Sequence, residues 1–386
     1  MTEHSLLGAS SAYRWLACPG SFHLSQIHPH RPSSIYAATG SLAHELIEGA
    51  VIAGEDTVDD GIAGQTWSKD GHTITIDRDM IDGVNVMMRY LDLEDSDWSK
   101  VEFRVSLDDY FIGPPPVPLF GTVDAALRDG ATLEIVDYKN GSGVVVSPVE
   151  NPQLLYYAAG VLREVPWADP IKLLRLTIVQ PHAQGVAPIR SWEITPLDLL
   201  MWVDDVLVPG VHACAQPDAP LNPGPWCRFC PVAGHCPRLH QDAVAMAKRD
   251  FDDSDMPQKP ADLARLLDQA ERAQLWIDRV REYAVEQLQA QVLIPGWGLV
   301  PTRATRKWND ADVSIAGMLS LSGIDDDAIW EKRLRSPAQM EKVVVRVLDR
   351  HSWNDIADKL VETKSSGVKL APNRKITAGE DFIDEE

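Results

Sequence analysis

The stretch that decides the fold is LFGTVDAALRDGATLEIVDYKNG, residues 119–141. Apolar residues alternate with other residues on both sides of the pair Asp129-Gly130, a favoured turn between antiparallel strands. The sequence therefore predicts a β-hairpin. Asp124 lies midway along its first strand. Asp137 and Lys139 end its second strand and, being two residues apart, share one face.

Asp124, Asp137 and Lys139 are the residue types that a divalent metal site for phosphodiester hydrolysis needs. Two carboxylates from paired strands can meet at one point and hold Mg²⁺ or Mn²⁺ through hard oxygen ligands. An adjacent cation helps to place and deprotonate the attacking water. An Asp-x-Lys pattern alone is a weak signal, because a solvated strand end with a surface ion pair has the same pattern.

Residues 39–54 predict a helix with an apolar face, to which Ala43, Leu46, Ile47, Ala50 and Val51 belong. His44 and Glu48 are four residues apart and share a different face. A histidine in this position can add a nitrogen ligand to a carboxylate metal site. The alternative is a surface histidine paired with Glu48, and the adjacent Glu45 competes for the metal role.

Residues 150–162 predict a second helix, with Asn151 as its cap and Pro152 in its first turn. Gln153 and Tyr157 are four residues apart and share a face of this helix. Strand-like segments follow at 171–181 and 188–195. The alternation of helices and strands predicts an α/β core with a mixed sheet.

A second motif is WCRFCPVAGHCPRL, residues 226–239, which holds three of the five cysteines. The spacing of Cys227, Cys230 and Cys236 is that of a metal-binding loop, and such a site needs a fourth ligand. We favour Cys18, in a Cys-Pro-Gly turn that we expect to be exposed, over His235 and His240. Spacing alone leaves zinc and iron–sulfur open. The fifth cysteine, Cys214, is predicted to lie near a helix end.

Composition restricts the class of protein. The 386 residues are 45% hydrophobic, which indicates a globular chain, and no apolar run approaches the ~18 residues of a membrane span. The N-terminus has no secretory pattern, and five cysteines do not make a disulfide scaffold, so a reducing cytoplasm is expected. A net charge of −21 argues against a general nucleic-acid binder, although it permits a local basic groove or a metal-screened site.

The chain is predicted to have four parts. Residues 1–246 form the α/β domain, and residues 247–260 are polar and read as a linker. Residues 261–362 form a mainly helical accessory region that begins with a long amphipathic helix. Within it, residues 296–308 alternate and carry cations, which suits either a DNA-facing strand or a charged edge strand. Residues 363–386 are expected to be disordered.

The order of these motifs resembles the RecB-like branch of the PD-(D/E)XK nuclease superfamily. The resemblance covers about residues 10–240 and rests on His44, Gly121–Asp124, Asp137–Lys139, Gln153 to Tyr157, and the cysteines that bracket them. The relatives it suggests are phage and prophage proteins and CRISPR-associated RecB-like exonucleases that carry an iron–sulfur cluster. It implies a restriction-endonuclease-like α/β core with a central mixed sheet flanked by helices, here followed by a mainly helical C-terminal region.

The resemblance also implies a role for each matched residue. The catalytic residues would be Asp124, Asp137, Lys139, Gln153 and Tyr157. Mg²⁺ or Mn²⁺ would be held by His44, Asp124, Asp137 and the carbonyl of Tyr138. A [4Fe–4S] cluster would be held by Cys18, Cys227, Cys230 and Cys236, with zinc as the alternative. The proline that the family places before the first aspartate is replaced here by Val123.

We therefore expect a Mg²⁺- or Mn²⁺-dependent DNA exonuclease of phage or prophage DNA recombination or processing. Its partners would be the DNA substrate and a phage recombination protein, without a membrane. Two other classes of protein remain open. One is a non-catalytic nuclease-fold module that binds DNA or a partner protein, and the other is a zinc-stapled enzyme of different chemistry. Cleavage polarity, strand preference, endonuclease activity and oligomeric state are not encoded in these motifs.

Overall fold

A computed structural model describes residues 5–28, 34–69, 71–91, 96–164, 170–252, 257 and 259–299. The described residues belong to one compact unit, Met1–Leu299. The predictions for residues 300–386, including the tail and most of the strand at 296–308, lie outside the described residues. Residues 296–299 are described and are not in a strand.

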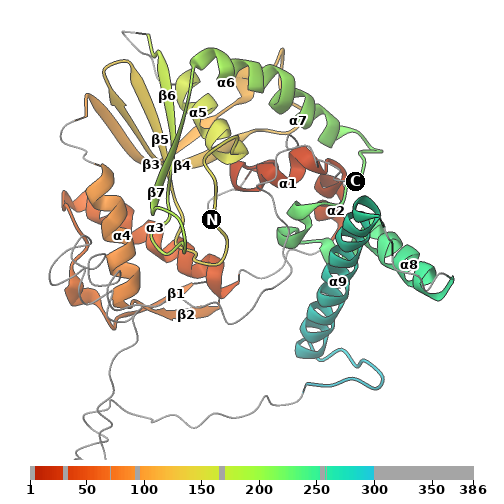
Figure 1. Ribbon diagram of the computed structural model, residues 1–386. Helices are drawn as coiled ribbons and strands as arrows, with labels where there is room; N and C mark the ends of the chain where they lie inside the picture. The colour runs from red at the N-terminus through yellow and green to blue at the C-terminus, as the bar shows by residue number, and fades with distance from the viewer. Residues whose placement is uncertain are drawn as a thin grey trace, which may run out of the picture. The chain divides into compact units, whose positions relative to one another are not determined.

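The centre of the fold is a five-stranded sheet (Figure 1). Its strands lie in the order β3 (Trp98–Ser106), β4 (Phe120–Asp129), β5 (Thr132–Tyr138), β6 (Leu173–Val179) and β7 (Ile189–Ile194). β5 and β6 are parallel, while every other neighbouring pair is antiparallel. The predicted α/β class with a mixed sheet is therefore confirmed.

The predicted hairpin is β4 and β5. Asp129 pairs with Thr132 at its end, and Gly130 in the turn has a φ of 55°, a left-handed value that glycine adopts without strain. Ala125 lies opposite Val136 in this register. The local signals in the sequence were sufficient here because a two-residue loop determines how the two strands align.

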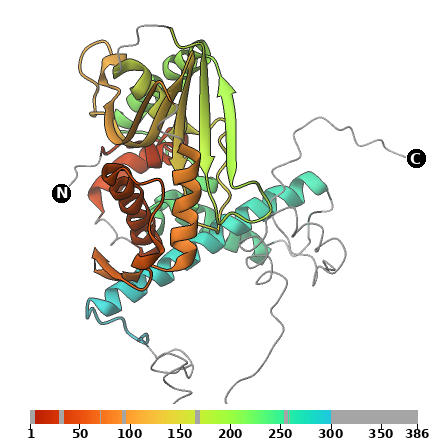
Figure 2. The same cartoon turned by 90° about the vertical axis from the view of Figure 1, so that its left-hand side faces the viewer.

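Helices cover both faces of the sheet (Figures 1 and 2). One face packs against η1 (Ala9–Ser11), α1 (Ala12–Ala17), α5 (Pro152–Glu164), α6 (Pro196–Trp202), η4 (Val203–Leu207) and α7 (Val208–Ala215). The other face packs against α3 (Ile35–Ala53) and α4 (Arg78–Leu91), together with the hairpin of β1 (Thr66–Lys69) and β2 (His72–Thr75). Two separate apolar cores result, one on each side of the sheet.

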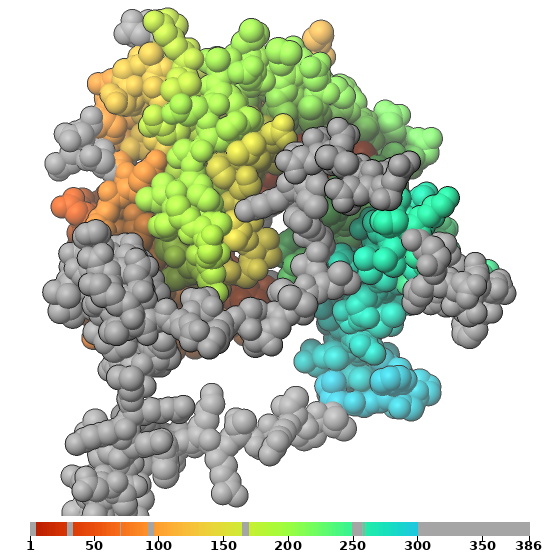
Figure 3. All heavy atoms as spheres, in the orientation of Figure 1, coloured from red at the N-terminus to blue at the C-terminus, as the bar shows by residue number. Residues whose placement is uncertain are grey.

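The elements that follow α7 include or flank three of the five cysteines, and they include the long helix. They are η5 (Pro225–Phe229), η6 (Ala233–His235), α8 (Pro237–Asp252) and α9 (Pro260–Gln289); α2 (Gly20–Ile27) and the short turns η2 (Asp60–Ile62) and η3 (Asp108–Tyr110) complete the set. α9 packs against α8 and η6, and its far end stands clear of the sheet (Figure 3). α8 continues past residue 246 into the segment predicted as a linker. Among the described helices, none has the length and apolarity that a bilayer crossing requires.

Candidate metal and active site

The register of the hairpin brings two predicted site residues face to face. One step beyond the pair Ala125 and Val136, the same register sets Asp124 opposite Asp137. Side chains directly opposite each other in an antiparallel pair point to the same face of the sheet. Both side chains are buried; burial raises the pKa of Asp137, and repulsion from the Asp124 carboxylate raises it further.

Asp137 begins a chain of polar contacts that reaches α5. The Nζ of Lys139 lies 2.8 Å from Asp137 Oδ2 and donates hydrogen bonds to Asp137 Oδ1 at 3.1 Å and to Gln153 Oε1 at 3.0 Å. Gln153 Nε2 in turn donates to the hydroxyl of Tyr157 at 3.4 Å. The structure thus brings four of the predicted catalytic residues into one connected group.

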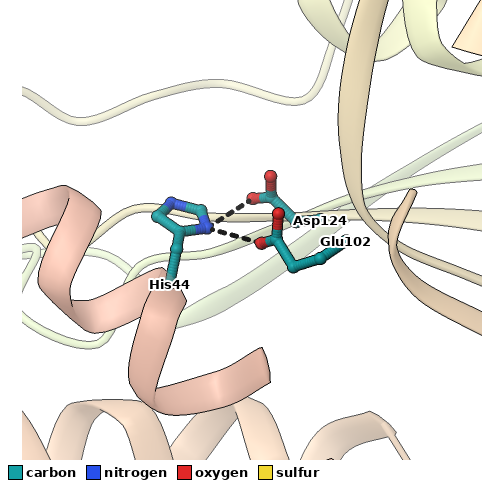
Figure 4. A group of neighbouring side chains, drawn as sticks. All are labelled: His44, Glu102 and Asp124. Carbon is teal, nitrogen blue, oxygen red and sulfur yellow. Dashed lines mark hydrogen bonds and ion pairs between the residues drawn. The ribbon is translucent and has the colours of Figure 1, made fainter. Parts of the chain in front are cut away.

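A second group of side chains meets at Asp124 (Figure 4). The Nδ1 of His44, on α3, lies 3.7 Å from Asp124 Oδ2 and 3.1 Å from Oε1 of Glu102, on β3. Among the described residues, these are the only three whose possible metal-ligating atoms all lie within 4.8 Å of one another. The backbone N–H of Tyr138 also donates to Asp124 Oδ2, at 2.8 Å, and thereby orients that carboxylate.

The protonation states reflect the crowding of negative charge. Burial alone would lower the pKa of His44, but Asp124 and Glu102 together raise it to about 9. Burial, partly offset by Lys139, raises the pKa of Asp137 to about 6, and burial also raises that of Asp124. Although burial opposes it, the attraction of Asp137 and Asp124 holds the pKa of Lys139 above its usual value. Protonated His44 and Lys139 therefore balance the carboxylates in the metal-free protein.

Glu102 is a site residue that the sequence analysis missed. Continuing the register of β3 and β4, in which Val101 pairs with Ala125 and Phe103 with Val123, places Glu102 opposite Asp124. Its φ of 46° lies in the left-handed region of backbone conformation, which is energetically unfavourable for residues other than glycine. The apolar alternation of residues 98–106 indicates a strand, but a neighbouring strand and its register are properties of the folded sheet.

The side of α3 that faces the sheet determines which of His44 and Glu45 lies near Asp124. Glu45 accepts hydrogen bonds from Trp67 Nε1 at 2.8 Å and Lys69 Nζ at 2.6 Å, both on β1, and so points away from the group at Asp124. The pairing of His44 with Glu48 is replaced by its contacts with Glu102 and Asp124. The carbonyl of Tyr138 as a metal ligand stays a prediction.

The four favoured cysteines line one small pocket. Cys18, Cys227, Cys230 and Cys236 surround it together with Arg14 and apolar side chains such as Leu24 and Trp226. The expectation of an exposed turn at Cys18 is wrong, because its residue is only 6% exposed. Gly20, two residues after Cys18, packs directly against the backbone of Ala219. A Cβ at this position would lie 2.5 Å from the carbonyl oxygen of Ala219, so only glycine fits.

Backbone amides surround these sulfurs. The N–H of Asn222 donates to Cys18 Sγ at 3.3 Å, and that of Gly224 donates to Cys227 Sγ at 3.4 Å. Cys230 and Cys236 also receive backbone hydrogen bonds. Burial nevertheless raises the pKa of Cys227 to about 11 and raises those of Cys230 and Cys236. As thiols without a metal these groups are therefore neutral near pH 7.

The competing ligands lie elsewhere. His235 stacks on His28 and contacts Tyr283, while His240 packs on Trp276, and neither histidine lines the pocket. Cys214 is fully buried near the end of α7, where its thiol donates to the carbonyl of Trp15 and burial raises its pKa to about 12. The lining of the pocket thus includes the four favoured cysteines and none of these three competing side chains.

Comparison with known proteins places the chain in a family. Residues 4–375 match the family described as "Protein of unknown function (DUF2800)", and the chain belongs to it. A solved structure titled "Crystal structure of SSO0001" aligns with 61% of this chain and 88% of that chain, at 15% sequence identity and a TM-score of 0.32. That score describes a weak likeness between the two chains.

Proposed function

We propose that this protein is a divalent-metal-dependent deoxyribonuclease with a RecB-like PD-(D/E)XK core, and that it degrades DNA from an end. The observation that carries the proposal is the pair Asp124 and Asp137 on one face of the β4–β5 hairpin, with Lys139 Nζ 2.8 Å from one carboxylate and His44 Nδ1 3.7 Å from the other. Oxygen and imidazole ligands beside a buried ammonium group suit phosphodiester hydrolysis by a metal-activated water.

The donor set fits Mg²⁺ or Mn²⁺ on its own chemistry. Asp124 and Asp137 are buried carboxylates, and Asp137 Oδ2 accepts no hydrogen bond, although the Lys139 ammonium lies beside it. A divalent ion held by His44, Asp124 and Asp137 would neutralise charge on the scissile phosphate and lower the pKa of the attacking water. A metal-bound imidazole is neutral, so His44 would have to give up the proton that it carries in the metal-free protein before it could hold the ion.

The remaining residues of the site position the reacting groups. Lys139 donates to Gln153 as well as to Asp137, so its ammonium is held in one place. There it can hydrogen-bond a non-bridging phosphate oxygen as the water forms its new P–O bond and the ester P–O bond breaks. Tyr157 supports Gln153 through their contact and stays neutral, because burial holds its pKa well above the usual value.

The proposal includes an iron–sulfur cluster in the cysteine pocket. Four buried cysteines with N–H donors at their sulfurs suit a thiolate-bound metal. Zinc bound by four thiolates needs its sulfurs about 3.8 Å apart, given Zn–S bonds of ~2.3 Å in a tetrahedron. Among the described residues no three cysteine sulfurs lie within 4.8 Å of one another. A cubane tolerates wider spacing, because each cysteine binds a different iron.

The test is digestion of end-labelled linear DNA with Mg²⁺ or Mn²⁺. Wild-type protein should shorten the DNA from its ends, and Asp137→Asn should lower the rate by at least about 100-fold, because an amide replaces a metal-binding carboxylate. The matched control is Glu134→Gln, on the same strand, whose carboxylate instead accepts hydrogen bonds from Tyr90 and Thr177.

Each outcome has a definite meaning. Cleavage by wild type and by Glu134→Gln, with little cleavage by Asp137→Asn, supports the nuclease. Wild-type protein that carries its metal and binds DNA without cutting it would make the chain a non-catalytic module. If the protein cuts circular DNA as fast as linear DNA, it is an endonuclease and the proposal of an exonuclease is wrong.

A further inference from the structure

Glu102 projects into the site from an unusual backbone position. It lies in the edge strand β3, in the row that crosses the sheet through Asp124 on β4 to Asp137 on β5. Its φ of 46° lies between Val101 and Phe103, which pair with Ala125 and Val123 on β4. The Glu102 side chain is 15% exposed, and its Oε1 points at the Nδ1 of His44 (Figure 4).

The spacing of the donor atoms is that of ligands around one ion. Neighbouring ligands of an octahedral ion with bonds of ~2.0–2.1 Å are about 2.9 Å apart, and opposite ligands about 4.1 Å apart. His44 Nδ1 lies 3.1 Å from Glu102 Oε1 and 3.7 Å from Asp124 Oδ2, and all three donors fall within 4.8 Å of one another. Small side-chain movements would bring these atoms to bonding distance.

A separate observation points to a cation at the same place. Asp137 is 1% exposed, and its carboxylate is paired with Lys139 Nζ, 2.8 Å from Oδ2. Asp137 faces Asp124 across the hairpin. With Glu102, Asp124 and Asp137 ionised, His44 neutral and Lys139 charged, the five side chains carry a net charge of about −2, which one divalent ion neutralises.

We propose that Glu102 is a direct ligand of the divalent ion, which it binds together with His44 and Asp124. The strained backbone of β3 is retained because it directs this carboxylate at the ion, where a regular strand would direct it elsewhere. The inference rests on the proposed function only for the class of metal. It is tested by metal binding without DNA, so its failure is distinguishable from a failure of the nuclease proposal.

The experiment measures Mn²⁺ binding to the full chain by calorimetry and by the electron paramagnetic resonance of free Mn²⁺. Glu102→Gln keeps the shape of the side chain and an oxygen that can contact His44, but it loses the charge. It should weaken Mn²⁺ binding by more than about 100-fold, beyond the ~10–100-fold loss that follows removal of a residue that only hydrogen-bonds a ligand. The matched control is Glu45→Gln, beside His44 in sequence but bonded to Trp67 and Lys69, which should bind as wild type does.

A second pair of variants separates a ligand from a residue that only orients His44. With Co²⁺, Glu102→Cys should produce a sulfur-to-cobalt charge-transfer band, over and above the spectrum of Co²⁺-treated wild type, because a thiolate then lies in the coordination sphere. Glu45→Cys should not. Three results would overturn the assignment. They are wild-type Mn²⁺ affinity in Glu102→Gln, a loss of affinity in Glu45→Gln as large as that in Glu102→Gln, and no new band in Glu102→Cys. Thermal melting of each variant verifies that it is folded.

Discussion

The described part of the chain contains two groups of side chains that we propose as metal ligands, and the two groups differ in geometry and charge. In the carboxylate site, made of His44, Glu102, Asp124, Asp137 and Lys139, the donors come from strands and a helix, and three of them lie within 4.8 Å of one another. In the cysteine pocket, made of Cys18, Cys227, Cys230 and Cys236, the sulfurs come from short turns and helix ends and do not gather so closely.

The difference lies in what balances the charge when no metal is bound. Protonated His44 and Lys139 neutralise part of the carboxylate site, so its charged groups already have partners. The thiols of Cys227, Cys230 and Cys236 stay neutral because burial raises their pKa values. The carboxylate site therefore keeps its charges paired without an ion, whereas a metal bound in the pocket would have to displace the protons of the thiols.

The largest effect is expected from Cys18→Ser. Cys18 connects the start of the chain to the loop near Asn222, 204 positions later, and loss of a ligand should release the metal. The free energy of unfolding should fall by more than about 4 kcal/mol, because ligation energy is folding energy. Iron and zinc content, visible absorption and thermal melting measure this in anaerobically purified protein.

The control for Cys18→Ser is Cys214→Ser, which changes a buried thiol outside the pocket. It should keep the metal and lower stability only by the cost of a modified buried contact, about 1–2 kcal/mol. Metal loss in Cys214→Ser with retention in Cys18→Ser would show that the ligand assignment is wrong. If the purified protein is colourless and contains zinc, the pocket binds a structural zinc ion and not an iron–sulfur cluster.

Lys139→Ala should separate chemistry from metal binding in the carboxylate site. Loss of the ammonium beside the attacked phosphate should lower cleavage by about 100-fold or more, while Mn²⁺ still binds. Without metal the variant should melt at a lower temperature than wild type, because buried Asp137 loses its ion-pair partner, and Mn²⁺ should restore much of that loss. If folded Lys139→Ala cleaves DNA at the wild-type rate, Lys139 has no role in catalysis.

The metal-free protein should lose stability as pH rises through the range in which His44 titrates. The folded pKa of His44 is about 9, above the unfolded value of about 6.5, so its contribution is complete below pH 6.5 and is lost as pH rises toward 9. The contribution is at most about 3 kcal/mol. The folded pKa of Asp137, about 6, is also above its ordinary value of 3.8, so its contribution to stability is likewise lost as pH rises, but between those two lower values.

Thermal melting with a chelator, from pH 6 to pH 10, measures this dependence. His44→Gln should remove the part of the slope above pH 7, because the glutamine does not titrate. An unchanged slope in His44→Gln would mean that other groups cause it.

The smallest effect is expected from Tyr157→Phe. Its hydroxyl contacts Gln153 at 3.4 Å, a long hydrogen bond, and acts on Lys139 only through that amide. Cleavage should fall by about three-fold, against about ten-fold for Gln153→Ala, which removes an acceptor of the Lys139 ammonium. Single-turnover rates on linear DNA compare the two, and a larger loss in Tyr157→Phe than in Gln153→Ala would give the tyrosine a direct role.

The sequence by itself was enough to predict the features that depend on neighbours in the chain. The pair Asp129-Gly130 determined the hairpin and with it the facing positions of Asp124 and Asp137. Helical spacing located α3 and α5, and cysteine spacing identified the loop at 227–236. Each of these signals is local, because turn chemistry and residue periodicity act within about ten residues.

Only the tertiary structure decided which distant residues meet. β3 and α4 were not predicted, so the register that sets Glu102 opposite Asp124 was unknown. His44 and Glu45 are adjacent in sequence, and the packing of α3 on the sheet determined which of them reaches Asp124. Cys18 reached the cysteine pocket because Gly20 permits close backbone contact with Ala219. Such long-range pairings follow from packing of the whole core, which no local pattern encodes.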